Sequence, residues 1–300
     1  MQLTERIQPG ILKPVPAVAR SITFRVSNPE RVAATLRRFA SEFSTDWGIA
    51  ALGEPCALAL GARLPGLRTF PPMSGPGCAV PSTQEALWVR LCGPDRGIVF
   101  DYARAVRQLL VDAFSLSGTL DTFTYHGGRD LTRFEDGTEN PQDDAAVQAA
   151  IVADGPLAGS SYLAVQQWVH DLDRFGSFSE DARDDIIGRS AKTNDELDDA
   201  PASAHVKRTA QESFDPPAFM VRRSMPWAGV ETEGLEFVAF VDALDKFTRM
   251  MRRMAGLEDG IVDGLFSFSR PVTGAYYWCP PAAGGRLDLG LLLDRKAGAP

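Results

Sequence analysis

Acidic residues, a glycine turn and a proline are packed together in residues 129–141, which read RDLTRFEDGTENP. Asp136-Gly137 is a strong turn dipeptide, and the residue before Pro141 is confined to extended or turn conformations. The turn presents the Asp136 carboxylate at a bend beside the aromatic Phe134. A carboxylate held in this way can accept a proton from a substrate. A solvated Asp-Gly turn has the same spacing, so the residues alone leave both interpretations open.

Histidine is the other residue type here that can carry a proton or bind a metal, and the chain has three: His126, His170 and His205. Their spacing singles out none of them, because a lone histidine is more often a packed or surface residue. The four cysteines are scattered without a CxxC pair, which disfavours a zinc site. The choice of a metal ligand therefore stays open at this level.

Hydrophobic periodicity predicts an α+β fold in which one order of elements occurs twice. We expect strands at residues 21–26, 86–92, 161–169 and 235–241, and helices at 29–43, 97–114, 179–187 and 244–254. This order fits two ferredoxin-like halves, residues 1–150 and 151–300, packed side by side with a junction at 143–159. A large apolar pocket is easily built between the sheets and helices of two such halves.

Composition is that of a soluble globular protein, with 300 residues, 44% hydrophobic and 23% charged. The net charge of -8 argues against nucleic acid and against an anionic membrane surface as partners, since both attract basic proteins. The first residues lack the pattern of a secretory signal, and no run of about twenty apolar residues is present. We therefore expect a cytoplasmic protein with reduced cysteines.

Five segments resemble those of the dye-decolourising peroxidases, and of their compact bacterial branch in particular, in the same order along the chain. They read QPGILKPVPAVARSITFRV, RDLTRFEDGTENP, SAHVKRT, VRRSMPW and SFSRPVTGAYYWCPP. The resemblance spans nearly the whole chain. It implies a haem b pocket enclosed by two ferredoxin-like halves. The activity it implies is oxidation of dyes, phenolic compounds and Mn(II) in one-electron steps at the expense of hydrogen peroxide.

The same resemblance implies the site residues. Asp136 is the distal acid–base, Arg222 stabilises charge as the O–O bond breaks, and His205 is the iron ligand. A carboxylate that accepts the other N–H of His205 is expected at Asp263, with Asp259 as the alternative. The remaining residues expected to contact the haem are Arg189 and Arg208 at the propionates, with Gly137, Thr138, Ser224 and Phe240 around the ring. Arg222 and Arg223 cannot both face the pocket, because adjacent strand residues point opposite ways.

Two positions depart from the family pattern. Arg133 stands where the family signature begins with glycine, three residues before the catalytic aspartate. Glycine often serves a positive φ there, so the backbone at Arg133 is in question. Ser224 stands where relatives often carry asparagine, which predicts a wider peroxide pocket or an additional water. We expect the pKa of Asp136 near its ordinary range, since burial raises it and Arg222 lowers it.

Three functions are compatible with these residues: the peroxidase, a haem-binding or haem-handling protein without a physiological peroxidase role, and an interaction module without haem. Asp136 and Arg222 together favour the enzyme. The resemblance also implies a homo-oligomer. Some bacterial relatives carry a short apolar peptide that docks inside a protein nanocompartment shell, and the leucines at 287, 289 and 291–293 have a similar composition. A last strand or helix packed on the body is the alternative for this tail.

Overall fold

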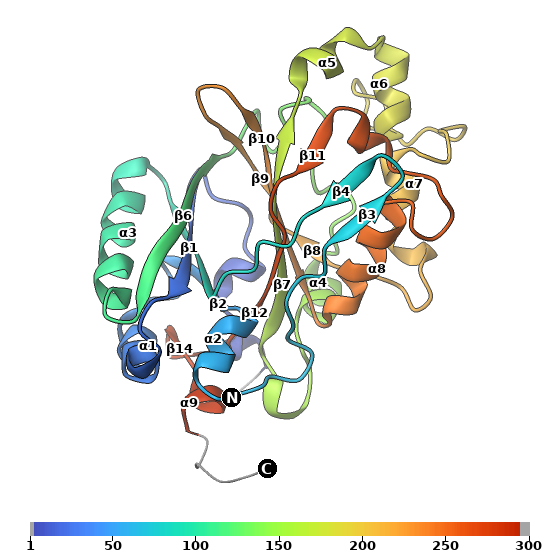
Figure 1. Ribbon diagram of the computed structural model, residues 1–300. Helices are drawn as coiled ribbons and strands as arrows, with labels where there is room; N and C mark the ends of the chain where they lie inside the picture. Colours follow the sequence, from blue (N-terminus) through green and yellow to red (C-terminus); the bar gives the residue numbers. More distant parts are fainter. Residues whose placement is uncertain (1–2, 295–300) are drawn as a thin grey trace.

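One ten-stranded sheet is the framework of the computed structural model, which describes residues 3–294 (Figure 1). Its strands are β1 (Val18–Val26), β2 (Gly48–Leu52), β5 (Leu87–Gly93), β6 (Phe114–Phe123), β7 (Ser161–His170), β8 (Val221–Arg222), β9 (Met225–Ala228), β10 (Glu233–Val241), β11 (Ser269–Pro271) and β12 (Ala275–Cys279). Two hairpins lie outside it: β3 (Met73–Gly75) with β4 (Cys78–Val80), and β13 (Ala282–Ala283) with β14 (Arg286–Leu287).

Neighbouring strands of the large sheet run in the order β6-β1-β5-β2-β12-β7-β10-β8, with β9 paired to β10 and β11 paired to β7. The first four strands come from the first 150 residues and the last four from the remainder. The two sets meet where Trp278 of β12 pairs with Leu52 of β2. The α+β fold with ferredoxin-like strand groups is therefore as expected. The boundary at residues 150 and 151, where a helix ends, stays a prediction.

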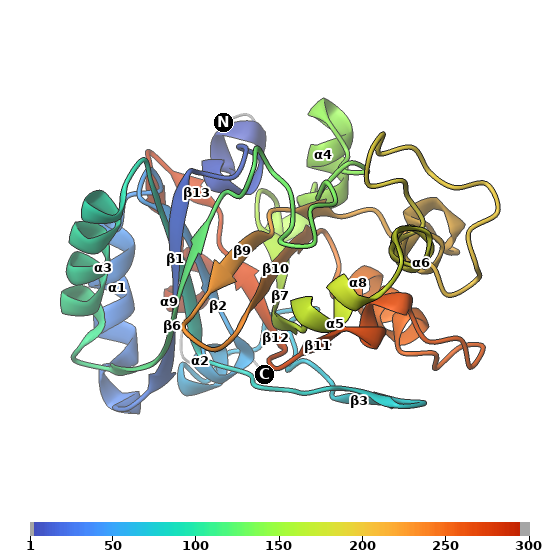
Figure 2. The same ribbon diagram turned by 90° about the horizontal axis from the view of Figure 1, so that it is seen from above.

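Helices cover both faces of this sheet (Figure 2). They are α1 (Val32–Glu42), α2 (Glu54–Ala59), α3 (Arg96–Leu110), α4 (Asp143–Ala150), α5 (Leu172–Ser177), α6 (Glu180–Ile187), α7 (His205–Thr209), α8 (Leu244–Met254) and α9 (Gly290–Leu293). The buried side of α8 carries Leu244, Phe247, Met250, Met251 and Met254, the spacing of one helical face. The buried residues of α8 belong to the same core cluster as those of α1 and α3, whereas α4 packs on the other face of the sheet. Within residues 3–294 no helix is long and apolar enough to cross a membrane.

All eight predicted elements are present, and the main error concerns β6. We expected a helix to residue 114, but α3 ends at Leu110 and β6 begins at Phe114. β6 reads FSLSGTLDTF, and it is largely exposed or half-buried because it lies at the edge of the sheet. An edge strand with one solvated face carries few apolar residues, so it gives a weak periodic signal.

The leucine-rich tail packs on the body of the protein. Leu287, Leu289 and Leu292 are 6%, 3% and 4% exposed and belong to the largest core cluster. Arg37 donates to the Leu293 carbonyl oxygen at 2.6 Å, which ties α9 to α1. The structure therefore favours the packed-helix alternative for these leucines over a docking peptide.

Truncation after Ala283 should lower the melting temperature by several degrees, because it removes three core leucines at once. Leu292→Ala should reproduce part of the loss. Differential scanning calorimetry of the two variants beside the full chain measures both effects. A truncated protein that melts with the full chain would show that the tail is dispensable for stability.

Candidate functional site

A cavity lies between the sheet and α8, on the face that α8 covers. Its walls are largely apolar, and its polar lining comes from several separate segments of the sequence. The apolar wall consists of Trp168, Ile187, Leu235, Phe237, Phe247, Met250, Met251, Met254 and Leu265. The polar groups include Asp136, Arg222 and His205, so all three principal residues expected from the sequence meet around one cavity.

His205 begins α7, and its ring orientation is fixed by a carboxylate. Nδ1 of His205 lies 2.8 Å from Oδ2 of Asp263, whose side chain is fully buried. Asp263 is itself held, because its other oxygen accepts from the Leu265 N–H at 2.8 Å and its own N–H donates to Met254. Because Nδ1 bonds Asp263, Nε2 is the nitrogen that remains for an external ligand. The structure thus places Asp263, rather than Asp259, beside His205.

Arg208 and Asp259 form a separate pair. The Arg208 guanidinium donates to both Asp259 oxygens at 2.7 and 2.9 Å, and to the Arg253 carbonyl oxygen at 2.6 Å. These bonds hold the pKa of Asp259 down to about 2. Arg208 is not among the residues that line the cavity. The expectation that Arg208 binds a haem propionate is therefore not supported, since Arg208 does not line the cavity and both of its Nη groups bond Asp259 or Arg253.

Asp136 and Arg222 are brought together by Asn140. The Asn140 side chain accepts from the Arg222 N–H at 2.8 Å and donates to the Arg222 carbonyl oxygen at 3.1 Å. This pair of bonds fastens the loop that carries Asp136 to the short strand β8. Arg222 lines the cavity, so its guanidinium can donate to a ligand bound there. Its Nε is buried and has no hydrogen-bond partner among the described residues. Arg223, as expected, turns away and donates to the Leu12 carbonyl oxygen at 2.6 Å.

The pKa of Asp136 is raised above its ordinary value, contrary to our expectation. Desolvation by the surrounding protein is the largest effect and raises the pKa, although the residue is exposed to solvent at the cavity. The positive charge of Arg222 lowers it, while the negative charge of Asp130 raises it further. The sequence argument weighed burial against the charge of Arg222 and missed the charge of Asp130.

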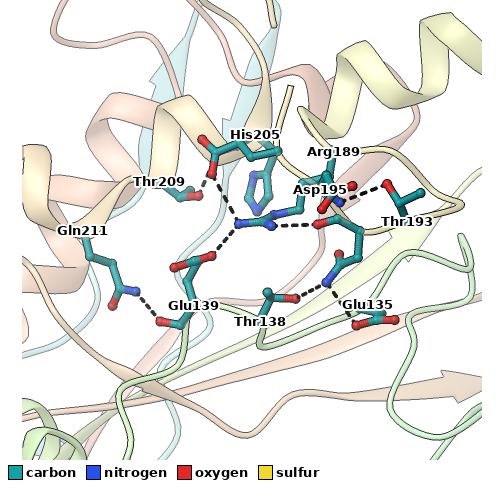
Figure 3. Close-up of polar contacts among 11 residues, drawn as sticks. Glu135, Thr138, Glu139, Arg189, Thr193, Asp195, His205, Thr209 and Gln211 are labelled. Atoms are coloured by element: carbon teal, nitrogen blue, oxygen red, sulfur yellow. Dashed lines mark hydrogen bonds and ion pairs between the residues drawn. The ribbon is translucent and has the colours of Figure 1, made fainter. Parts of the chain in front are cut away.

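Arg189 lies at the cavity wall within a polar network that joins two loops (Figure 3). Its guanidinium bonds Glu139, the Glu196 carboxylate at 3.4 Å and the Asn194 carbonyl oxygen at 2.9 Å. Asn194 donates to Glu135 at 3.0 Å and to Thr138 Oγ1 at 3.1 Å. Thr138 and Gly137 both line the cavity, so this cluster places a cation and several polar groups beside it.

Phe240 faces away from the cavity, and this expectation was wrong. Successive side chains of a strand alternate between the two faces, so positions 235 and 240 of β10 cannot share one. Leu235 and Phe237 line the cavity, whereas Phe240 is buried in the core on the opposite face. The tyrosines and tryptophan of β12 are likewise core residues, each at most 1% exposed.

Ser224 borders a second cavity, of about 130 Å³, rather than the first. This second cavity shares Asp136, Gly137 and Arg222 with the main one, so it lies directly behind the distal pair. The Ser224 hydroxyl accepts from the Val238 N–H at 3.3 Å. The short serine side chain is thereby tied to the sheet, and space remains beside Asp136.

Arg133 has a φ of 74°, which is the left-handed conformation that favours glycine. The glycine of the family signature therefore has a conformational reason, and Arg133 adopts the same backbone with a side-chain penalty. We expect Arg133→Gly to stabilise the protein by roughly 0.5–1 kcal/mol, because relief of strain exceeds the entropy that glycine adds to the unfolded chain. Urea denaturation measures this difference. An unchanged or lower free energy of unfolding would mean that the Arg133 side chain makes compensating contacts.

Sequence reasoning missed three groups that line the main cavity or border it. Asn140 carries a signal in the sequence, because a side-chain amide beside a turn often bonds a neighbouring backbone. His170 and Ser269 also line the cavity, and His170 bonds both Ser269 and Asp130. His126 is exposed beside Tyr125 and is not part of the lining.

These residues fit an iron porphyrin. One imidazole nitrogen is free for a metal and the other is bound to a carboxylate, as in histidine-ligated haem sites. Apolar side chains surround the place where a flat ring would lie, and Arg189 offers a cation for its carboxylates. Asp136 and Arg222 line the same cavity and offer an acceptor and a donor to a small polar ligand.

Several known proteins resemble this chain in sequence, and several solved structures resemble it in fold. Residues 127–284, which are more than half of the chain, match the family model described as "Dyp-type peroxidase, C-terminal". A dye-decolorizing peroxidase of Rhodococcus erythropolis is 31% identical over 230 residues, which cover 74% of this chain and 67% of that protein. One of Mycobacterium tuberculosis is 30% identical over 228 residues, covering 73% and 68%.

Solved structures agree with this. A dye-decolorizing protein from V. cholerae is 28% identical, with a TM-score of 0.80 over 90% of this chain and 96% of that one. A DypB variant from Rhodococcus jostii RHA1 in complex with heme is 25% identical, with a TM-score of 0.84 over 90% and 94%. The cavity with its histidine, aspartate and arginine accords with both sets of relatives. This chain belongs to the dye-decolorizing peroxidase family, whose members are haem-dependent oxidoreductases.

Proposed function

We propose that this protein is a haem b peroxidase that uses hydrogen peroxide to oxidise dyes and phenolic compounds. One observation carries the proposal: His205 with its Asp263 partner and the distal pair Asp136 and Arg222 line the same cavity. A haem-carrying protein needs the histidine, but it has no need for a proton acceptor and a guanidinium in the same cavity. The arrangement therefore favours catalysis over haem handling.

The residues have distinct roles in this proposal. His205 holds the iron through Nε2, and Asp263 accepts the N–H of Nδ1, which makes the imidazole a stronger ligand. Haem, when bound, supplies an iron centre that exchanges electrons with peroxide and with organic donors. Asp136 takes a proton from one peroxide oxygen and returns it to the other, so that water leaves. Arg222 stabilises the negative charge that develops on the departing oxygen. Arg189 pairs with a propionate in place of Glu139 or Glu196.

Small aromatic molecules are the proposed electron donors, because one-electron oxidation needs access to the haem edge rather than a shaped pocket. Mn(II) is included as an inorganic donor, since another DypB variant has been described in complex with manganese. Within residues 3–294 no group of three or more metal-binding side chains is present. We therefore place aromatic molecules ahead of Mn(II) as the proposed electron donors. A homo-oligomer, a nanocompartment shell as partner and a cytoplasmic location remain predictions.

The test begins with pyridine haemochrome absorbance of the purified protein, which identifies haem b and its stoichiometry. Peroxide-dependent bleaching of an anthraquinone dye, and oxidation of a phenol and of Mn(II), are then measured on the same sample. Haem b with dye or phenol turnover supports the proposal. Stoichiometric haem without turnover of any donor would favour the haem-handling alternative, and absence of haem binding would reject both.

A further inference from the structure

Two carboxylates lie on one tightly bonded loop beside the cavity. The Asp130 N–H donates to the Phe134 carbonyl oxygen at 2.9 Å, and the Asp136 N–H donates to Gly128 at 3.2 Å. Phe134, between them, is 6% exposed and packs in a cluster with Phe175 and Phe268. The loop is therefore anchored at its centre, and the positions of Asp130 and Asp136 are fixed relative to each other. The proposed mechanism uses only Asp136.

Asp130 is held by a histidine at the end of β7 and by a threonine of its own loop. Its Oδ1 lies 3.2 Å from His170 Nε2 at the end of β7, and the Thr132 N–H donates to Oδ2 at 2.9 Å. His170 Nδ1 in turn lies 2.6 Å from the hydroxyl of Ser269 in β11. The side chains of His170 and Asp130 are only 7% and 15% exposed. The Asp130–His170 pair is thus a nearly dry contact, and His170 and Ser269 line the same cavity as Asp136.

Hydrogen bonds determine whether the Asp130 carboxyl group is ionised. Burial by itself raises the pKa of this carboxyl, but the hydrogen bond and charge of His170, together with the Thr132 bonds, outweigh burial and lower it. Asp130 therefore stays ionised. Its negative charge raises the pKa of Asp136, an effect opposite to that of Arg222.

We propose that Asp130 and His170 are positioning residues for the distal carboxylate: their pairing keeps a fixed negative charge beside Asp136 and so strengthens Asp136 as a proton acceptor. This inference rests on the proposed peroxidase function of Asp136. The charged and titratable groups that act on Asp136 are Asp130 on its own loop, Arg222 on β8 and His205 on α7. The charged group next to His170 is Asp130, and the Ser269 hydroxyl and the Phe268 ring are uncharged neighbours of His170.

The first measurement uses the haem-free protein, so it does not depend on peroxidase activity. Aspartate labelled with ¹³C at Cγ is titrated by NMR, and the Asp136 signal is identified by its loss in Asp136→Asn. In Asp130→Asn the Asp136 midpoint should fall by at least about half a pH unit, because a like charge has been removed. His170→Phe should lower it too, since Asp130 without its partner takes up a proton. The double variant should shift the midpoint no further than the larger single shift.

Asp171→Asn is the matched control. Asp171 follows His170 directly, but its carboxylate caps α5 by accepting from the Arg174 N–H at 2.8 Å, and asparagine can cap in the same way. An Asp136 midpoint that stays in place in Asp130→Asn, or moves equally in Asp171→Asn, would overturn the proposal. If Asp130→Asn does not fold, His170→Phe answers the same question.

The second measurement is the pH dependence of the peroxide reaction in the haem-loaded protein. The acid limb should move to lower pH in Asp130→Asn, and the rate above it should fall, because a weaker base takes the peroxide proton more slowly. A lower rate at every pH with an unmoved limb would mean that Asp130 only supports the loop, and the proposal would be wrong. Failure of the wild type to react with peroxide would instead count against the proposed function and leave the NMR result standing.

Discussion

Asp136→Asn should slow the reaction of the haem-loaded protein with hydrogen peroxide by about 10²–10⁴, the usual contribution of a positioned acid–base group. Asparagine keeps the shape of the side chain but cannot take the peroxide proton. Arg222→Leu should slow the reaction at least as much if charge stabilisation dominates, because it removes the guanidinium whose Nε is unpartnered. Stopped-flow mixing, followed at the Soret band, measures both rates.

The pH dependence gives an independent check on Asp136. Only the ionised carboxylate accepts a proton, so the rate should fall as pH drops through the pKa of Asp136. Burial and Asp130 raise this pKa, which places the acid limb above the ordinary range of an aspartate. If Asp136→Asn reacts at the wild-type rate while Arg222→Leu does not, Arg222 carries the O–O cleavage and Asp136 only shapes the pocket or orders water.

His205→Ala should abolish tight haem binding, with a rise in Kd of at least about 100-fold, because it removes the imidazole that holds the iron. Asp263→Asn should weaken binding by about 10–100-fold through loss of the carboxylate partner. Soret titration with haem, and transfer of haem to apomyoglobin, give the affinity and the dissociation rate.

His126→Ala is the control for this series, since His126 is exposed and does not line the cavity. His170→Phe should also retain haem. A full Soret band and unchanged turnover in His205→Ala would refute the assignment of the ligand, and loss of haem in the His126 variant would point to another ligand.

The sequence was informative where short motifs or regular periods carry the information. Resemblance named Asp136, Arg222, His205 and Asp263, and the structure brings all four to one site. Periodicity located β1, β5, β7, β10 and the helices that cover them. Phe240 was an avoidable error, because the two-residue period of a strand already excludes it once Leu235 faces the cavity.

The sequence did not predict contacts between distant segments of the chain. Arg208 bonds an aspartate 51 residues away, and His170 bonds a serine 99 residues away. No local pattern predicts such pairs, since they depend on how the strands and loops are placed in space. The pKa of Asp136 was misjudged for the same reason. Its local sequence shows a turn, whereas its proton affinity depends on enclosure by protein and on a second carboxylate held by a different strand.

The position of β12 has a consequence for biosynthesis. This strand begins at Ala275, yet it lies in the middle of the large sheet, between β2 and β7. While the chain emerges from the ribosome, β2 and β7 each keep an unpaired apolar edge until these late residues arrive. Such edges promote pairing with other chains. The nascent protein should therefore depend on chaperones late in synthesis, and its two strand groups should join only near the end of translation.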